Sequence, residues 1–315
     1  MSRTGVVLPR DLPSAQVLPY ARRAEELGFD ELWVVEDLSF RGGIAQAAAV
    51  LASTSRLAVG VGIAPAGARN AAFAAMEAAT LAELFPRRTS FGLGHGMPGW
   101  MRQVGAWPAS PLTLLEEQLR AVRALLHGEH VDVAGRHVQL RDLQLASPPP
   151  QPPPVLAGVR GPKSLAVSGR CADGTILAEP VTPEYLAAAR AQIGAAGPHT
   201  LVAFEVAVVD DDAARARTLV RPALEWAGEP DCAVHIAPSP FAAEFRALRE
   251  RCATRAEFTA AMPDAWVDEL AVVGTPETAR ARVAQLHAAG ADSVVLIPVG
   301  ADRLAALDDL ARLLG

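Results

Sequence analysis

Three side chains that can exchange protons or accept hydrogen bonds follow apolar runs in the first hundred residues. Glu36 and Asp37 come directly after Trp33–Val35, and His95 stands between two glycines. Adjacent carboxylates can accept hydrogen bonds from a polar ring or substrate, and an imidazole can donate a proton to a ligand beside it. The alternatives are a helix cap or solvated turn for the carboxylates and a satisfied turn for the histidine. We take Glu36, Asp37 and His95 as candidate catalytic residues.

A second group of residues suits an anionic ligand. Arg160–Ser164 joins an apolar run to a helical pattern and contains Lys163, the only lysine of the chain. Loop amides at a helix N-terminus, together with a cation, form a natural phosphate cradle. An ordinary turn capped by Ser164 is the alternative. Asp173–Gly174 opens the next apolar run and can close the same pocket.

Glycine is concentrated at the ends of two of these apolar runs. Residues 56–65 read RLAVGVGIAP and residues 89–96 read TSFGLGHG. Glycine weakens a strand, so its repetition marks close approach of a ligand or sharp backbone geometry. We expect a flat ligand to lie across these two strand ends.

Other chemistries fit the sequence less well. The glycine pattern at 94–99 is followed by a proline-containing loop instead of a helix, which argues against a dinucleotide fingerprint. A Schiff-base aldolase needs a lysine at a strand end, and Lys163 lies beyond its strand. Glu36 and Glu179 could formally serve a glycosidase, but an aromatic content of 5% is low for a sugar-binding cleft.

No metal site is expected. The cysteines are scattered at positions 171, 232 and 252 and never form a CxxC pair, so neither a disulfide framework nor a cysteine-built zinc site is indicated. The histidines at 127, 130 and 137 fall at a helix end and in a small β-excursion, which favours a surface location.

Composition narrows the partners to a small-molecule substrate. The 315 residues carry a formal net charge of −6, which argues against a nucleic-acid partner. No apolar run approaches the roughly 20 residues that cross a bilayer, and the N-terminal stretch lacks the apolar core of a signal peptide. We therefore expect a cytoplasmic protein that does not engage membranes.

These residues need a scaffold, and the chain supplies eight short apolar runs separated by helical patterns. Such regular alternation favours a closed (β/α)₈ TIM barrel over an open Rossmann sheet, with residues 1–315 as a single domain. Val131–Leu145 predicts a β-excursion after the fourth helix, and Asp211–Ala271 predicts a helical insertion before the last strand. The expected barrel strands are Val6–Pro9, Glu31–Val35, Leu57–Ile63, Thr89–Leu93, Val155–Ala157, Gly174–Leu177, Leu201–Val209 and Ser293–Pro298.

The sequence resembles the bacterial luciferase-like family of flavin- and deazaflavin-dependent oxidoreductases. The resemblance spans almost the whole chain and rests on several phrases in the family's order. They are AEELGFDELWVVED, RLAVGVGIAPAGARN with AAFAAMEAATLAEL, FGLGHG, LLEEQLRAVRALLHGE, ASPPPQPPPVLAGVRGPKSLAVSGRCADGTIL and GTPETARARVAQLHAAGADSVVLIP.

The resemblance implies a barrel that holds FMN or the deazaflavin F420 at the carboxyl ends of its strands. It also implies a homodimer, a cis peptide bond at Gly62–Ile63 against the cofactor ring, and a phosphate held by loops matching Gly158–Ser164 and Asp173–Thr175. The cofactor-binding residues expected on these grounds are Gly62, Ile63, Ala64, Gly94, Gly158, Arg160, Gly161, Pro162, Lys163, Ser164, Asp173, Gly174 and Thr175.

We therefore predict an F420-dependent oxidoreductase that transfers hydride between the reduced deazaflavin and a small organic substrate. Glu36, Asp37 and His95 are expected to polarise the ring or substrate and to deliver protons. An FMN-dependent monooxygenase, supplied with reduced flavin by a partner reductase, is the alternative. A barrel that binds flavin without catalysis is a second alternative, although binding alone does not require acidic and histidine groups at strand ends.

Overall fold

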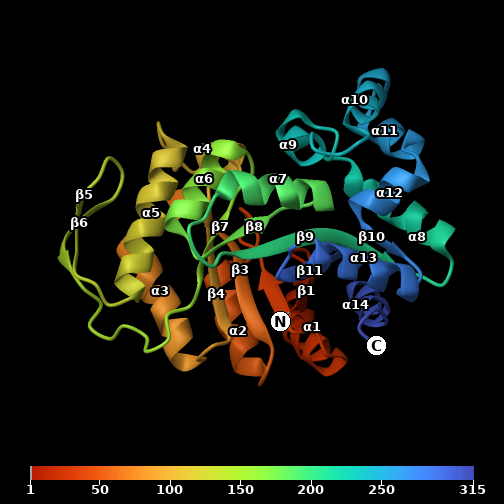
Figure 1. Ribbon diagram of the computed structural model, residues 1–315. Helices are drawn as coiled ribbons and strands as arrows, with labels where there is room; N and C mark the ends of the chain where they lie inside the picture. The colour runs from red at the N-terminus through yellow and green to blue at the C-terminus, as the bar shows by residue number, and fades with distance from the viewer. Residues whose placement is uncertain (1) are drawn as a thin grey trace.

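The computed structural model describes residues 2–315, and its centre is a closed barrel of parallel strands (Figure 1). A nine-stranded sheet closes because β8 pairs with β9; only the short β10 (Val272–Gly274) lies outside the ring, paired to β9. The predicted (β/α)₈ barrel is thereby confirmed. Its eight strands are β1 (Arg3–Val7), β2 (Glu31–Val34), β3 (Ala58–Pro65), β4 (Thr89–Gly94), β7 (Val155–Gly158), β8 (Gly174–Leu177), β9 (Thr200–Val209) and β11 (Ser293–Pro298).

Helices surround the strands because each strand is short and apolar and must be covered on its outer face. Local signals set their ends: α1 stops at Gly28, whose φ of 93° is left-handed, and Asn70 caps α3 through a bond from Ala72 N. The surrounding helices are α1 (Ser14–Leu27), α2 (Gly43–Ser53), α3 (Ala71–Leu84), α5 (Pro111–Leu126), α6 (Pro162–Cys171), α7 (Pro183–Ile193), α13 (Pro276–Ala288) and α14 (Arg303–Ala311).

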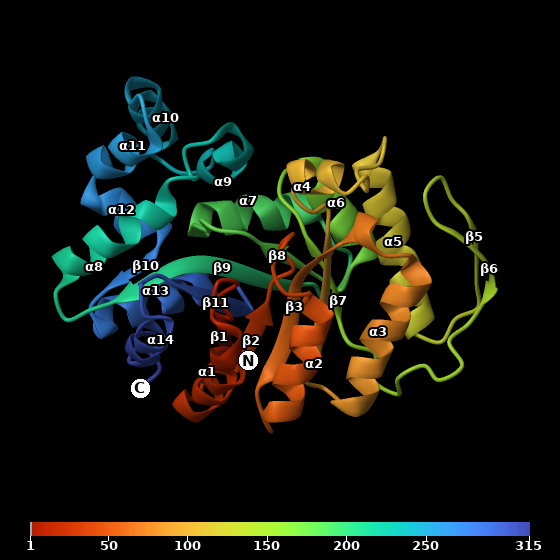
Figure 2. The ribbon, with the colours of Figure 1, turned by 180° about the vertical axis from the view of Figure 1, so that it is seen from behind.

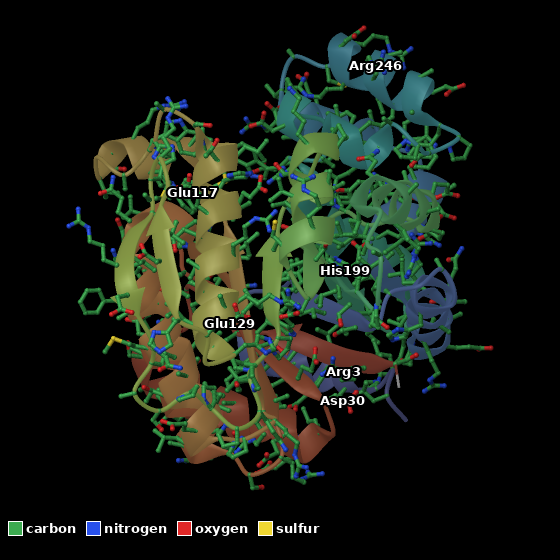
Figure 3. All side chains as sticks on the ribbon, turned by 60° about the vertical axis from the view of Figure 1, so that its left-hand side comes forward. Arg3, Asp30, Glu117, Glu129, His199 and Arg246 are labelled. Carbon is green, nitrogen blue, oxygen red and sulfur yellow. The ribbon has the colours of Figure 1, made fainter. Side chains whose placement is uncertain are left out.

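Between β4 and β7 the chain leaves the barrel twice. The loop after β4 contains a short helix, α4 (Pro98–Gln103), that the sequence pattern did not indicate. After α5, the antiparallel strands β5 (Val131–Ala134) and β6 (Gln139–Leu143) form a hairpin within the segment predicted as a β-excursion. Figure 3 shows Glu117 of α5 beside this hairpin, where its carboxylate accepts three backbone N–H bonds of 2.8 Å from the hairpin turn.

A helical insertion follows β9 and stands to one side of the barrel (Figure 2). Its core contains an aromatic cluster: Phe258 is fully buried, the Phe245 ring packs edge-on against it at 5.1 Å, and the Trp266 ring lies 5.7 Å from that of Phe245. Its elements are α8 (Ala213–Val220), α9 (Ala233–Ile236), α10 (Ala242–Arg251), α11 (Arg255–Ala261) and α12 (Asp264–Leu270), with 3-10 turns η2 (Arg221–Leu224) and η3 (Pro230–Cys232).

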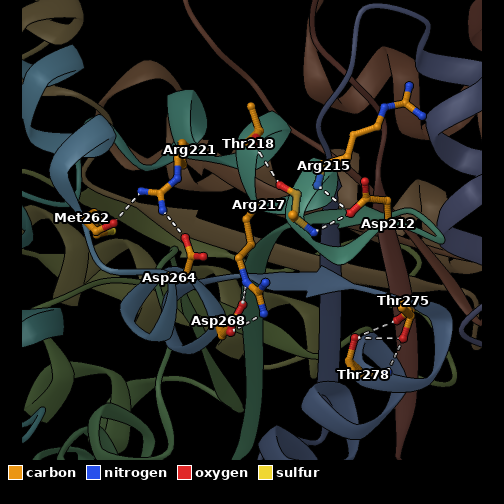
Figure 4. Close-up of polar contacts among 11 residues, drawn as sticks. Asp212, Arg215, Arg217, Thr218, Arg221, Met262, Asp264, Asp268, Thr275 and Thr278 are labelled. Carbon is orange, nitrogen blue, oxygen red and sulfur yellow. Dashed lines mark hydrogen bonds and ion pairs between the residues drawn. The ribbon is translucent and has the colours of Figure 1, made fainter.

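Ion pairs fix the two ends of this insertion to each other (Figure 4). Arg217 of α8 makes two bonds to Asp268 of α12, of 2.7 and 2.9 Å. Arg221 donates to the Met262 carbonyl at 2.7 Å and pairs with Asp264. The insertion therefore forms a compact unit over the edge of β9 and β10.

Inside the barrel, one large side chain explains the glycines of β3. Trp33 is buried and meets Phe204 edge-on at 5.5 Å. A β-carbon at Gly60 would lie 2.3 Å from the Trp33 ring, and one at Gly62 would lie 2.9 Å from it. These glycines make room for a tryptophan, a packing role that the sequence-based interpretation did not include.

No helix among residues 2–315 is both long enough and apolar enough to span a membrane.

Candidate active site at the carboxyl edge of the barrel

Glu36 lies at the carboxyl edge but both of its oxygens are occupied. The Arg69 guanidinium contacts them at 2.5 and 2.9 Å, and the backbone N–H of Gly43 donates to Oε2 at 2.9 Å. The hydrogen bonds to Glu36 raise the pKa of Arg69, so its charge is permanent. Glu36 therefore joins the start of α2 to the β3–α3 turn, and its geometry is that of a positioning residue.

Arg69 is itself held from the outer side of the barrel. Gln118 of α5 donates to the carbonyls of Ala66 (3.0 Å) and Arg69 (2.8 Å), on and directly after the 3-10 turn η1 (Ala66–Ala68). A cavity of about 400 Å³ lies beside this turn and includes Trp107 and Gln118 in its lining. It borders the carboxyl edge from the outer side, because Arg69, which pairs with Glu36, belongs to its lining.

Asp37 sits on the rim next to Glu36. Its Oδ2 pairs with Arg10 at 2.5 Å, and the Arg10 guanidinium also lies 5.0 Å from the centre of the Phe40 ring. The pair joins the loops that follow β1 and β2.

His95 directly follows β4 and reaches α6. Its Nε2 lies 3.1 Å from the Ser164 hydroxyl, whereas its buried Nδ1 makes no well-formed hydrogen bond within residues 2–315. Burial lowers the pKa of His95 below its usual 6.5, and the Pro111 carbonyl only partly offsets this. Burial therefore favours the neutral form of the imidazole. The structure thus brings together two features that the sequence predicted separately, the histidine and the anion-binding loop.

An apolar platform lies between β3, β4 and β7. The Gly62–Ile63 peptide bond is cis, as the resemblance implies. The Ile63 side chain lies over the paired residues Gly94 and Gly158: a β-carbon would meet it at 3.0 Å from Gly94 and 2.3 Å from Gly158. Ala64 is buried in the outer core and leaves only its backbone at the edge. Ile63 of β3, Gly94 of β4 and Gly158 of β7 therefore form one apolar contact at the strand ends, called the Ile63 platform below.

The loop Arg160–Ser164 borders this platform. Gly161, with a φ of 80°, is the N-cap of α6; Pro162 follows as the first helical residue and Lys163 is exposed. Arg160 turns away toward the insertion, where it donates to the Asp231 carbonyl at 3.3 Å. The helix N-terminus and Lys163 can hold an anionic group without it.

Asp173, Gly174 and Thr175 lie at the opposite edge of the barrel. Gly174 begins β8, and Asp173 Oδ2 accepts from the N–H of Val155, the first residue of β7. Thr175 is buried and bonds His199, just before β9, at 2.8 Å. The structure therefore separates these three residues from the others proposed to bind the cofactor.

Glu179 follows β8 by two residues. The sequence places it at a strand end, but it was not among the candidate catalytic residues. Burial raises the pKa of Glu179. The positive charge of Arg160 lowers this pKa, and the negative charge of Asp37 raises it further. The pattern that selected Glu36, a carboxylate directly after an apolar run, also applies to Glu179 and could have selected it.

The residues present fit a planar ring with an anionic tail. The Ile63 platform offers an apolar face, His95 Nδ1 is a buried polar atom without a well-formed hydrogen bond among residues 2–315, and α6 begins with backbone amides beside Lys163. Across residues 2–315, no group of three or more His, Cys, Asp or Glu side chains is arranged to hold a metal ion.

A family model described as luciferase-like monooxygenase matches residues 3–293. The chain belongs to this family. It is 27% identical over 314 residues to a 5,10-methylenetetrahydromethanopterin reductase of Methanolobus tindarius, covering 94% of each chain. It is 32% identical over 180 residues to an F420-dependent glucose-6-phosphate dehydrogenase of Beutenbergia cavernae, covering 53% of this chain and 52% of that one.

Solved structures agree with the barrel. The coenzyme F420 dependent tetrahydromethanopterin reductase from Methanopyrus kandleri superposes with a TM-score of 0.81 at 18% identity, covering 98% of this chain and 97% of that one. At this identity the match supports the luciferase-like barrel fold.

Proposed function

We propose that this luciferase-like protein is an oxidoreductase that uses the deazaflavin F420 to transfer hydride to or from a small organic substrate. The observation that carries the proposal is the Ile63 platform over Gly94 and Gly158, bordered by His95 and the N-terminus of α6. Support also comes from the relative named as F420-dependent, which is 32% identical over its matched part.

The bound cofactor would supply the hydride; the protein's residues would orient and enclose it. Ile63 would support one face of the ring system. Lys163 and the amides of α6 would hold the anionic tail, while Ser164 fixes the orientation of the neutral His95 beside the ring. Glu36 and Arg69 would keep the β3–α3 turn in place under this assembly.

Titration of the purified protein with F420 and, separately, with FMN tests the cofactor assignment through fluorescence quenching. The proposal predicts saturable binding of F420 and weak or absent binding of FMN. Tight FMN binding without a response to F420 would contradict it and would favour the monooxygenase alternative suggested by the family's description.

The proposal includes a homodimer. Helix α3 exposes Phe73 (63%), Met76 (50%) and Leu84 (66%), which fall on one helical face by their spacing. A second copy of the chain would cover this stripe. Sedimentation of wild type and Phe73→Glu tests it: a dimer that dissociates in the variant is expected, and a wild-type monomer would contradict the assembly.

A cytoplasmic location and a separate reductase also belong to the proposal. An enzyme that consumes reduced deazaflavin needs another enzyme to regenerate it in the same compartment.

A further inference from the structure

The acid–base groups predicted from sequence are all engaged at the carboxyl edge. Glu36 is bonded to Arg69 and Gly43, Asp37 pairs with Arg10, and His95 bonds Ser164. Glu179 differs from them, since no other described residue donates a hydrogen bond to its carboxyl oxygens; the one backbone N–H that faces them is its own.

The barrel places Glu179 opposite Asp37. Around the closed ring the strands follow the order β1, β2, β3, β4, β7, β8, β9, β11, so β2 and β8 are four strands apart in either direction. Asp37 follows β2 and Glu179 follows β8, and the charge of Asp37 acts on the Glu179 carboxyl across the opening. The Ile63 platform, built by β3, β4 and β7, occupies the arc between them. A substrate stacked on a ring at this platform would lie beside Glu179.

The backbone around Glu179 is held from two sides. Glu205 of β9 accepts the Val181 N–H at 2.6 Å, and His235 of the insertion bonds the Pro180 carbonyl at 3.1 Å. Both side chains are buried, at 1% and 0% exposure. These two contacts fix the backbone position from which the Glu179 side chain extends, and Glu179 itself is half-buried.

Charged and titratable groups face Glu179 from each element around it. Arg160 of the β7–α6 loop stabilises its ionised form, while Asp37, across the opening, disfavours it. Glu205 and the buried Cys232 thiol also interact with its charge. Burial is the largest influence, and it raises the pKa of Glu179 above its usual 4.5.

Resting on the proposed function, we propose that Glu179 is the proton-transfer residue of the reaction, acting on a substrate with a C=O or C=N bond. In the reducing direction the carbon of the double bond would accept a hydride, which the reduced cofactor would supply while becoming oxidised. The π electrons would move onto the heteroatom, Glu179 would donate its proton to that atom, and the Glu179 carboxylate would regain a proton from water. The reverse reaction takes the same proton from an alcohol or amine.

The first test uses the cofactor-free protein, with glutamate labelled by ¹³C at the side-chain carboxyl. The signal absent from Glu179→Gln identifies this residue, and Glu205→Gln identifies the other buried carboxyl as a matched control. We expect the Glu179 signal to titrate clearly above the usual 4.5. Titration at or below 4.5 would overturn the proposal, because the residue would then hold no proton to give at neutral pH.

The second test measures oxidation of reduced F420 with a panel of short ketones and cyclic imines. For a compound that is turned over, Glu179→Gln is expected to lower kcat by about 100-fold or more, the range of general acid catalysis, while the Kd for F420 changes less than about threefold. The wild-type rate should fall as pH rises through the Glu179 pKa, and this limb should vanish in Glu179→Gln. An unchanged kcat, or a pH limb that persists, would contradict the proposal.

The two hypotheses fail separately. Absence of F420 binding to wild type refutes the proposed function, whatever the carboxyl titration gives. Normal F420 binding with an ordinary Glu179 pKa refutes the role of Glu179 alone.

Discussion

Replacing Gly158 by alanine tests the platform on which the cofactor assignment depends. The new β-carbon would lie 2.3 Å from Ile63 Cγ2. Carbon atoms pack at about 3.5–4.0 Å, so one of the two groups must move by more than roughly 1 Å. Cγ2 is attached directly to the β-carbon of a β-branched side chain, so it can move only if the whole side chain rotates or shifts.

The size of the effect follows from the cost of overpacking, about 1–3 kcal/mol. In the free protein Ile63 can move out over the open edge, but a ring bound to the platform would force it back. Most of the cost should therefore appear as lost affinity, about 5- to 150-fold in the Kd for F420.

The assay is fluorescence titration with F420, with thermal melting as a check on folding. Gly99→Ala is the matched control, because a β-carbon there meets nothing within 4 Å. In a double-mutant cycle with Ile63→Ala, the combined loss should be smaller than the sum of the single losses, since the clash disappears with Ile63. If Gly158→Ala and Gly99→Ala bound F420 with the same Kd, F420 would not lie on the Ile63 platform.

Three further predictions concern the surroundings of the site. Arg69→Met leaves Glu36 without its ion partner and should lower F420 affinity by loosening the β3–α3 turn; the same titration checks it, and wild-type affinity would argue against the positioning role. Glu205 is buried and its pKa is raised well above the usual 4.5, so the wild type loses stability as pH rises from about 4.5 toward that higher pKa. In Glu205→Gln, the free energy of unfolding measured with urea should therefore change less between pH 5 and 8 than in the wild type. The same pH dependence in both proteins would contradict this role of Glu205. In the insertion, Phe258→Ala should cost about 3–5 kcal/mol, whereas Asp268→Ala should cost less than about 1 kcal/mol, because its ion pair is partly exposed; similar unfolding free energies for the two variants would contradict this ranking.

The barrel could be predicted from the sequence because each strand is a short apolar run and each helix has its own end signals. Boundaries agree within a few residues, as for Gly174–Leu177 and Ser293–Pro298, which are unchanged. The largest shift is in the first strand, Arg3–Val7 instead of Val6–Pro9. There Leu8 is buried but lies beyond the paired residues, so hydrophobicity alone placed the strand too late.

The site was harder to predict, because side-chain partners decide it. Sequence could place Glu36 at the edge but could not show that Arg69 and Gly43 occupy both of its oxygens. It assigned Asp173 to the cofactor pocket although that residue directly precedes β8 and so lies at the amino edge. The glycines of β3 looked like a ligand platform, but Trp33 fills the space beside them. Such contacts join residues far apart in the chain and leave no local pattern.

Hydrogen–deuterium exchange with and without F420 tests the central claim most directly, because it locates the cofactor on the barrel. We predict that bound F420 slows exchange at the end of β3 (62–64), at and after the end of β4 (94–97) and across the β7–α6 loop (158–164), and leaves 173–175 unchanged. Saturating F420 that protects none of these three segments, or protects 173–175 instead, would contradict a deazaflavin site at the carboxyl edge.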